Sequence, residues 1–445
     1  MKKLKSLLIL KSWKTNKFFV LIGVLLLIQI FLPNRGLGKM YIDINAPSLQ
    51  RINIAFPDFV NFTPLIQYPE FSMALPGVIS NDLFLSGYFM PMDKDAFLAE
   101  PTRNLDDVRY KDWSVIGSEL LLRGGFTAVG GSLEVEVILF DVHWARQILR
   151  RRFLGKIDDY RSLMHRVSNE LIFELTGNKG MFLSKLAFVG TATGYKEIYT
   201  SDYDGYNAKR MTSDKSIALF PRWSPKGDKI LYNSFKDGGP KLYLRDIRSG
   251  NVRGISARKG LNIGAAWGPD GTSIALTLSH KGNPDIYAID LKGKILSHLI
   301  SNWGIDISPT YSPDGKKLAF VSNKSGQPQI YVHDMLENRV ERITFNQRKY
   351  NTAPVWSKLN RIVFSGMKGS QIDIFTIDPD GGNLRQLTED QGKNEDPCWS
   401  PDGRYIAFSS NRDGGYHLYL MNANGRNQQK ITNFKGEQTS ASWSQ

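Results

Sequence analysis

The chain has 445 residues, with 57 Lys and Arg against 43 Asp and Glu, and a formal net charge of +14. Seven of the basic residues lie among the first 38 positions, which contain no acid, so the remaining 407 residues carry only +7. That surplus is too small and too dispersed to indicate a nucleic-acid partner, and the single cysteine, Cys398, excludes an internal disulfide.

The first 38 residues have the character of a targeting segment. Residues 1–17 are basic, residues 18–32 are an apolar run, and two glycines spaced two positions apart follow shortly afterwards. This order is typical of a secretory signal peptide, and the apolar run is shorter than the ~20 residues that span a bilayer. We therefore predict a signal peptide over residues 1–38, with an uncleaved anchor as the alternative.

The next 140 residues alternate between strand-like and helix-like patterns. The helix expected at 160–175 has apolar residues at offsets of 3, 4, 7, 11, 12 and 15, which is one helical face, and Gly177 is a natural stop. Interleaved strands and helices predict a small α/β domain over residues 50–178, preceded by a short segment, residues 39–49. The expected elements are strands at Arg51–Phe56, Ile116–Arg123, Leu133–Val142 and Gln147–Leu154, and helices at Pro76–Gly87 and Tyr160–Leu175.

From residue 181 to the C-terminus, one pattern recurs six times. Each copy contains four short β-rich runs separated by Gly, Pro, Asn and Asp, and no run has the period of a helix. A repeat of 40–45 residues with four strands is typical of a propeller blade. The clearest line of equivalent residues is aromatic, with steps of 43 to 45 residues: Trp223, Trp267, Tyr311, Trp356, Trp399 and Trp443.

The phase of the repeat predicts how the ring closes. The strand that ends at Trp443 has no downstream partner strand, whereas Ser184–Val189 has no upstream aromatic strand. We therefore expect one blade to be assembled from both ends of the region, which leaves no unpaired edge between first and last blades. The predicted fold is mainly β: a six-bladed β-propeller over residues 181–445, preceded by the small α/β domain.

A candidate binding surface follows from this geometry. The first strand of each blade lies nearest the propeller axis, so the loops leading into these strands open at one mouth of the channel. The polar and acidic groups there suit a partner that presents amides or basic groups, although polar residues that merely cap strand ends are the alternative. The candidates are Phe220, Leu261, Asn262, Asp306, Ile307, Ser308, Asn351, Thr352, Asn394, Glu395, Asp396, Glu437 and Gln438.

Nothing in the pattern indicates catalysis, a metal or a cofactor. The six histidines lack metal-ligand spacing, and the aspartates that repeat before turns, such as Asp246 and Asp290, suit side chain-to-backbone hydrogen bonds. There is no Gly-x-Ser-x-Gly motif of a hydrolase, and the mouth loops lack the arginine cluster of sialidase-like propellers. We therefore expect a protein that is not an enzyme.

The order of these parts resembles the TolB family of periplasmic proteins of the Tol–Pal system. The Trp-Ser-Pro-Asp-Gly repeat is shared by many propellers, whereas the α/β domain joined through Leu175-Thr176-Gly177 is more specific; Trp356-Ser357-Lys358 departs from the repeat. The resemblance covers the chain after residue 38. It rests on residues 52–59, 81–89, Asp112-Trp113, His165, 175–180 and 201–207.

The resemblance implies a non-enzymatic periplasmic adaptor, monomeric and associated with membranes only through its partners once the signal is removed. It would bind the peptidoglycan-associated lipoprotein, Pal, through the propeller mouth and the inner-membrane protein TolA through residues 39–49. The implied TolA contacts are Tyr41, Ile42, Asp43 and Ile44. Such a system supports outer-membrane integrity and cell division; the alternatives are a periplasmic scaffold or sensor with another partner, or a propeller hydrolase.

Overall fold

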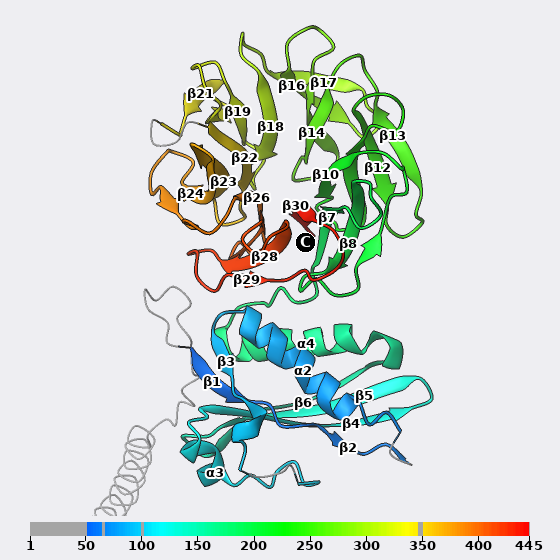
Figure 1. Cartoon of the computed structure of the whole chain (residues 1–445), viewed down its shortest axis with the longest axis vertical. Coiled ribbons are helices and arrows are strands. Elements are labelled where there is room, and N and C mark those ends of the chain that lie inside the picture. Colours follow the sequence, from blue (N-terminus) through cyan, green and yellow to red (C-terminus); the bar gives the residue numbers. More distant parts are fainter. Residues whose placement is uncertain (1–50, 65–66, 99–101, 346–349, 445) are drawn as a thin grey trace, which may run out of the picture.

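The computed structural model of the chain describes residues 51–64, 67–98, 102–345 and 350–444. A small α/β domain lies beneath a ring of six four-stranded sheets (Figure 1), so the predicted fold class is confirmed. The predicted signal peptide and residues 39–49 lie outside the described residues. Within the described part, no helix is both long enough and apolar enough to cross a membrane.

The α/β domain is one mixed sheet with two long helices on the side that faces the propeller (Figure 1). The strand order is β3-β1-β4-β5-β6, with the short β2 paired to β4; β1, β2 and β3 run parallel to their neighbours, and β4 to β6 are antiparallel. The elements are β1 (Ile52–Ala55), β2 (Val60–Asn61), α2 (Phe71–Leu85), β3 (Phe89–Pro91), a 3-10 turn (Lys94–Ala96), α3 (Tyr110–Val115), β4 (Leu120–Val129), β5 (Ser132–Asp141), β6 (Arg146–Lys156), a 3-10 turn (Ile157–Asp159) and α4 (Tyr160–Thr176).

Helix α2 begins earlier than the sequence pattern suggests. The prediction began at Pro76, but the helix begins at Phe71 and contains the proline. Proline lacks the N–H that would bond the carbonyl four residues earlier, and that carbonyl, of Ser72, instead accepts the N–H of Phe59 at 2.8 Å. The helix tolerates Pro76 because a segment from another part of the domain satisfies the freed acceptor.

The strand predicted at Ile116–Arg123 is wrong in its first half. Helix α3 ends at Val115, and Gly117 has a φ of +81°, which turns the chain before β4 begins at Leu120. A positive φ is a conformation that glycine adopts without steric cost. The other three predicted strands and the helix predicted at 160–175 agree with β1, β5, β6 and α4 to within three residues at each end.

Each propeller sheet is a meander whose first strand lies nearest the axis and whose neighbours are antiparallel. The turn that begins at Ser357, between β22 and β23, lacks the Pro-Asp-Gly sequence. It still closes its hairpin, because Asn360 takes the left-handed conformation (φ +57°) that glycine adopts in other blades. The strands are β7 (Lys185–Gly190), β8 (Glu197–Asp202), β9 (Lys209–Arg210), β10 (Ala218–Trp223), β11 (Lys229–Ser234), β12 (Lys241–Asp246), β13 (Val252–Ser256), β14 (Asn262–Trp267), β15 (Ser273–Leu278), β16 (Asp285–Asp290), β17 (Ile295–Ile300), β18 (Asp306–Tyr311), β19 (Lys317–Ser322), β20 (Gln329–Asp334), β21 (Arg339–Arg342), β22 (Tyr350–Trp356), β23 (Ile362–Lys368), β24 (Gln371–Ile377), β25 (Arg385–Gln386), β26 (Asn394–Trp399), β27 (Tyr405–Ser410), β28 (His417–Asn422), β29 (Gln429–Lys430) and β30 (Gln438–Trp443).

The ring closes by pairing the two ends of the propeller region. Strand β30 is the innermost strand of the sheet β30-β7-β8-β9, as the phase of the repeat predicts. The N–H of Ser444 donates to the carbonyl of Lys185 at 2.8 Å, and the Trp443 indole N–H donates to Ser184 Oγ at 2.6 Å. The last and first segments of the propeller are therefore joined by backbone and side-chain hydrogen bonds.

The aromatic line of the repeat packs between blades. Trp223, Trp356, Trp399 and Trp443 are buried, and the indole N–H of Trp399 donates to the carbonyl of Val355, on the inner strand of the preceding blade, at 3.1 Å. A buried tryptophan combines a large apolar surface with one donor that needs a partner. These residues therefore fix each inner strand against its neighbour.

We predict that Trp443→Ala lowers the free energy of unfolding by about 3–5 kcal/mol, because it removes a large buried side chain at the closure. The change is measured as the shift of the urea midpoint followed by circular dichroism. Trp144→Ala is the matched control, because that side chain is 68% exposed and its loss costs about 0.5 kcal/mol or less. Equal midpoints for the two variants would contradict the role assigned to the closure.

Candidate functional site

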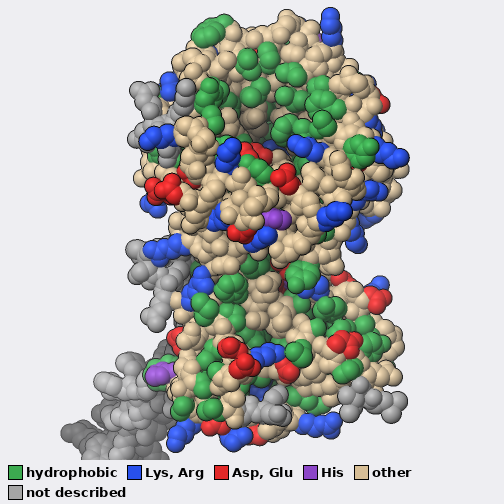
Figure 2. Space-filling model, viewed as in Figure 1, with side chains coloured by type: hydrophobic (Ala, Val, Ile, Leu, Met, Phe, Trp, Pro, Cys, Tyr) green, Lys and Arg blue, Asp and Glu red, His purple; other side chains and the backbone are tan. Residues whose placement is uncertain are grey.

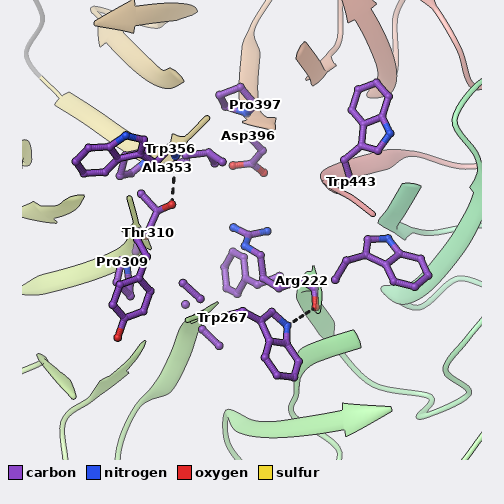
Figure 3. A pocket seen from close by; sticks show the side chains of 18 of the residues that line it. Arg222, Trp267, Pro309, Thr310, Ala353, Trp356, Asp396, Pro397 and Trp443 are labelled. Carbon is purple, nitrogen blue, oxygen red and sulfur yellow. Dashed lines mark hydrogen bonds between the residues drawn. The ribbon is translucent and has the colours of Figure 1, made fainter. Parts of the chain in front are cut away.

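A cavity of about 620 Å3 occupies the channel of the propeller and is lined by all six inner strands. Proline, alanine and the aromatic residues of the repeat form most of its wall (Figure 3). The cavity begins just after the starts of the inner strands, at residues such as Ile263 and Ile307, and extends to residues that follow these strands, such as Pro225 and Lys358. The loops that lead into the inner strands lie before this stretch in each blade and do not contribute to its described lining.

A strict alternation of exposure marks the start of every inner strand. One residue in each blade is buried, and the residues immediately before and after it are at least partly exposed. Successive side chains of a strand point to opposite sides, so the two flanking side chains face the mouth while the middle one faces into the blade. The middle residues are Ala218, Asn262, Asp306, Asn351, Asn394 and Gln438, each no more than 2% exposed.

The polar middle residues hold the loops in place. Asn262 donates to the carbonyl of Arg258 at 2.7 Å and accepts from Ser256 Oγ at 2.7 Å. Asp306 accepts from Asn302 Nδ2 at 2.7 Å, and Asn351 donates to Gln329 Oε1 at 2.8 Å. Buried polar groups need such partners, so these side chains position the mouth rather than face a ligand.

Asn394 and Gln438 act in the same way. Asn394 Oδ1 accepts from the Arg412 guanidinium at 2.8 Å. Gln438 donates to the carbonyl of Phe434 at 3.2 Å, and its side-chain oxygen lies 2.8 Å from Nδ1 of His417. Four of the thirteen candidates, Asn262, Asp306, Asn394 and Gln438, are therefore buried supports of their loops, and the buried Asn351 binds Gln329 of the preceding blade. The partly or fully exposed candidates are Phe220, Leu261, Ile307, Ser308, Thr352, Glu395, Asp396 and Glu437.

Each inner strand also has a β-bulge where it enters the channel. The register shifts in all six inner pairs, and the bulged residues have φ between +51° and +64°. This turns backbone N–H groups toward the preceding blade: that of Asp396 donates to Ser365 Oγ, and that of Ser440 to Ser409 Oγ, both at 3.1 Å. The left-handed conformation, which is costly for residues with a Cβ, is thus repeated in register around the ring.

The described cavity lining contains three charged side chains, Arg222, Lys358 and Asp396. Arg222 and Asp396 extend into the cavity from different blades (Figure 3), and the carboxylate of Asp396 accepts from Ser440 Oγ at 2.5 Å. Burial lowers the pKa of Arg222, an effect that the charge of the Asp396 carboxylate opposes. A guanidinium and a carboxylate held apart in one hollow suit a ligand that offers both an acceptor and a donor.

Beside the cavity, burial raises the pKa of Glu395. A hydrogen bond from Tyr416 lowers this pKa, and the charge of the adjacent Asp396 carboxylate raises it. Burial also raises the pKa of the Cys398 thiol to about 12, so the thiol stays protonated.

Sequence reasoning missed three residues of the channel and its mouth. Arg222 and Ile263 line the cavity, and Trp303 is 76% exposed in the loop before β18. A usable signal was present: Leu219, Ile263 and Ile307 recur at steps of 44 residues, in phase with the repeat.

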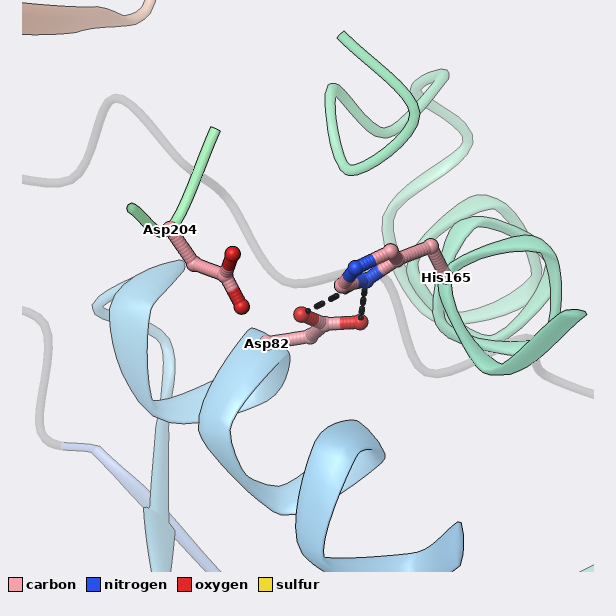
Figure 4. A group of neighbouring side chains, drawn as sticks. All are labelled: Asp82, His165 and Asp204. Carbon is pink, nitrogen blue, oxygen red and sulfur yellow. Dashed lines mark hydrogen bonds and ion pairs between the residues drawn. The ribbon is translucent and has the colours of Figure 1, made fainter. Parts of the chain in front are cut away.

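A second cluster lies where the two domains meet. His165 of α4 is paired with Asp82 of α2, its Nδ1 lying 2.8 and 3.1 Å from the two carboxylate oxygens, and Asp204 of the propeller lies beside them (Figure 4). The Tyr203 hydroxyl donates to Asp82 at 2.6 Å, and the Arg161 guanidinium donates to Asp204. All three members of the cluster are buried.

This junction cluster, Asp82, His165 and Asp204, has the residue types of a metal site, but protein donors already satisfy both carboxylates. Arg161 also places a positive charge where a cation would sit, which disfavours a metal there. The arrangement is instead a polar connection between domains, because Tyr203 and Asp204 belong to the propeller, whereas Asp82, Arg161 and His165 belong to the α/β domain.

Comparison with known proteins matches both parts of the chain. A family model described as the TolB amino-terminal domain matches residues 40–148, and one described as the TolB beta propeller domain matches residues 173–445. The crystal structure of TolB from Acinetobacter baumannii is 28% identical, covers 89% of this chain and 97% of that chain, and superposes with a TM-score of 0.77.

Curated relatives match over part of their length. The Tol-Pal system protein TolB of Desulfosudis oleivorans is 41% identical over 205 residues, which is 45% of this chain and 46% of the relative. That of Syntrophotalea carbinolica is 38% identical over 213 residues, 47% of this chain and 49% of the relative. The chain thus spans about half the length of the curated relatives that it matches.

The junction cluster predicts a pH dependence of stability. Burial lowers the pKa of His165, and the positive charge of Arg161 lowers it further. The hydrogen bond to Asp82 and the negative charges of Asp82 and Asp204 raise the pKa by more, so the net pKa of His165 is raised. A raised pKa in the folded state means that protonated His165 stabilises the fold below its unfolded pKa of about 6.5. This stabilisation is lost as the pH rises through the folded value.

We therefore expect the urea midpoint to fall between pH 6 and pH 8, and to fall less in His165→Gln. His143→Gln is the control, because that histidine is exposed, and it should keep the pH dependence of the unchanged chain. An identical pH dependence in His165→Gln and in the unchanged chain would show that His165 is not protonated in the junction.

Proposed function

The chain belongs to the TolB family, and from that premise we propose that it is a non-enzymatic periplasmic adaptor of a Tol–Pal system. In this proposal the propeller mouth binds Pal and the segment at residues 39–49 binds TolA, which supports outer-membrane integrity and cell division. The observation that carries it is the mouth and the channel behind it: all six inner strands line a cavity of about 620 Å3, and in four blades a buried polar side chain binds the loop that leads into the inner strand. A partner binds such a preformed surface without paying to order it.

The chemistry of the cavity supports binding over catalysis. The described lining contains one arginine and one carboxylate, whereas a sialidase-like site requires several arginines and a carboxylate pair. Arg222 and Asp396 instead offer a donor and an acceptor to a polypeptide that enters the channel. Among the exposed candidates, Ser308, Thr352, Glu395 and Glu437 add polar contacts around the rim.

The start of the described chain supports the assignment of the N-terminal segment. Arg51 donates to Asn427 of the propeller at 2.6 Å, and its guanidinium lies 5.6 Å from the centre of the Phe84 ring of α2. The first described residue, Arg51, therefore lies beside the junction of the two domains, and residues 39–49 precede it in the sequence. In this proposal Tyr41, Ile42, Asp43 and Ile44 supply the TolA contacts.

The Pal proposal predicts that Glu395→Lys with Asp396→Lys weakens binding about 30-fold or more. The two changes replace carboxylates of the mouth by positive charges, which repel the basic groups that we expect on the partner. Asp306 is unsuitable for this test, because it is buried and supports its loop. The measurement is a calorimetric titration of residues 39–445 with the soluble domain of Pal from the same organism.

Glu341→Lys is the control for that titration, because Glu341 lies on the outer strand β21 and is exposed. It should bind Pal as tightly as the unchanged chain. Saturable one-to-one binding that only the mouth variant loses supports the adaptor, whereas the absence of binding by folded protein indicates a scaffold or sensor with another partner.

The TolA proposal predicts that deleting residues 39–49 abolishes binding of the periplasmic domain of TolA and leaves the affinity for Pal within about threefold, because the two partners use different parts of the chain. The same titration measures both. Full TolA binding by the shortened chain would contradict the assignment of Tyr41 to Ile44.

A further inference from the structure

The mouth of the propeller is chemically two-sided. Two positions flank the buried middle residue at the start of each inner strand. In strands β10, β14 and β18 both positions carry aliphatic residues, whereas in strands β22, β26 and β30 both carry polar ones. We name the first set the apolar crescent: Ile217, Leu219, Leu261, Ile263, Ile305 and Ile307. We name the second set the polar arc: Tyr350, Thr352, Lys393, Glu395, Glu437 and Thr439.

The apolar crescent is exposed to solvent. Ile217 and Ile305 are 46% and 44% exposed, and the other members are partly exposed. In the space-filling view, hydrophobic side chains border the hollow over β14 and β18, and acidic side chains border it on the side of β26 and β30 (Figure 2). Contiguous apolar surface of this kind, rimmed by polar residues, is typical of a protein interaction site.

Trp303 extends the crescent to its outer edge on a rigid loop. Its side chain is 76% exposed, although the loop is held on both sides: Asn283 Nδ2 donates to the carbonyl of Asn302 at 2.9 Å, and the N–H of Ile305 donates to Asn323 Oδ1 at 2.7 Å. An exposed tryptophan on a fixed backbone has the character of an anchor that carries much of the energy of an interface.

The polar arc faces the crescent across the mouth. Glu395 and the neighbouring Asp396 are partly exposed, Glu437 is exposed, and Lys393 is the one cation among the six flanking residues of the arc. The arc therefore favours amide or basic groups on a partner, whereas the crescent favours aliphatic or aromatic ones. A uniformly polar or uniformly apolar segment would leave one half of the mouth unpaired.

We propose that the mouth binds an amphipathic polypeptide segment in one orientation, with its apolar side on the crescent and Trp303 and its basic or amide side on the arc. This inference rests on the proposed function, and the occupant is a segment of Pal. The crescent mainly slows dissociation of the complex, because apolar anchors act mainly on the dissociation rate. The arc orients the partner and speeds association, because charges at the rim act mainly on the association rate.

The test measures association and dissociation rates of the exported chain with the soluble domain of Pal over a range of salt concentrations. Trp303→Ala with Ile305→Ser should raise Kd about 30-fold or more, mostly through faster dissociation, with an unchanged salt dependence. Glu395→Gln with Glu437→Gln should slow association and flatten the salt dependence.

The matched control is Val252→Ser with Leu296→Ser, which removes two apolar side chains that are 40% and 55% exposed on the outer strands β13 and β17. It should bind Pal as the unchanged chain does, and circular dichroism checks that every variant keeps the fold.

If the crescent variant binds like the control, the two-sided recognition is wrong and the adaptor function stands. If the crescent variant only dissolves a dimer of this chain, the occupant is a second copy and the inference is also wrong. If the folded unchanged chain does not bind Pal, both the inference and the proposed function are wrong.

Discussion

The pairing of β30 with β7 is the interaction on which the rest of the structure depends. Because the last strand of the chain is the inner strand of the first blade, the sheet of that blade forms only when both ends of the region meet. Closure leaves no free sheet edge between first and last blades, and the indole of Trp443 adds a hydrogen bond to Ser184 across it. The ring then places six equivalent strand starts around one axis, which is what turns six separate loops into a single mouth.

At that mouth, buried and exposed side chains alternate at the start of each inner strand, and the two kinds have different roles. In four blades the buried middle residue binds its own loop, and the flanking residues differ between blades. The framework is therefore nearly six-fold symmetric, while the surface is apolar on one side and polar on the other. An asymmetric surface on a symmetric framework selects one orientation of a partner, which a uniform ring could not do.

Much of the fold could be predicted from the sequence, because each blade repeats at a fixed period and its turns are built from local residues. The mouth was located by the same period, but not the roles of its members: the burial of Asp306 depends on Asn302 and on the neighbouring strands. The start of α2 could not be predicted because Phe59, remote in sequence, satisfies the carbonyl freed by Pro76. The contact of Tyr203 with Asp82 joins residues 121 positions apart, and no local pattern reports it.

In our proposal the partner lies on the mouth formed by the loops before the inner strands. The decisive measurement is hydrogen exchange of residues 39–445, alone and with the soluble domain of Pal. We expect slower exchange on binding in the loops around residues 215–219, 259–263 and 301–307, with little change in the turns at the opposite ends of the inner strands. Protection confined to those opposite turns or to the α/β domain would contradict it.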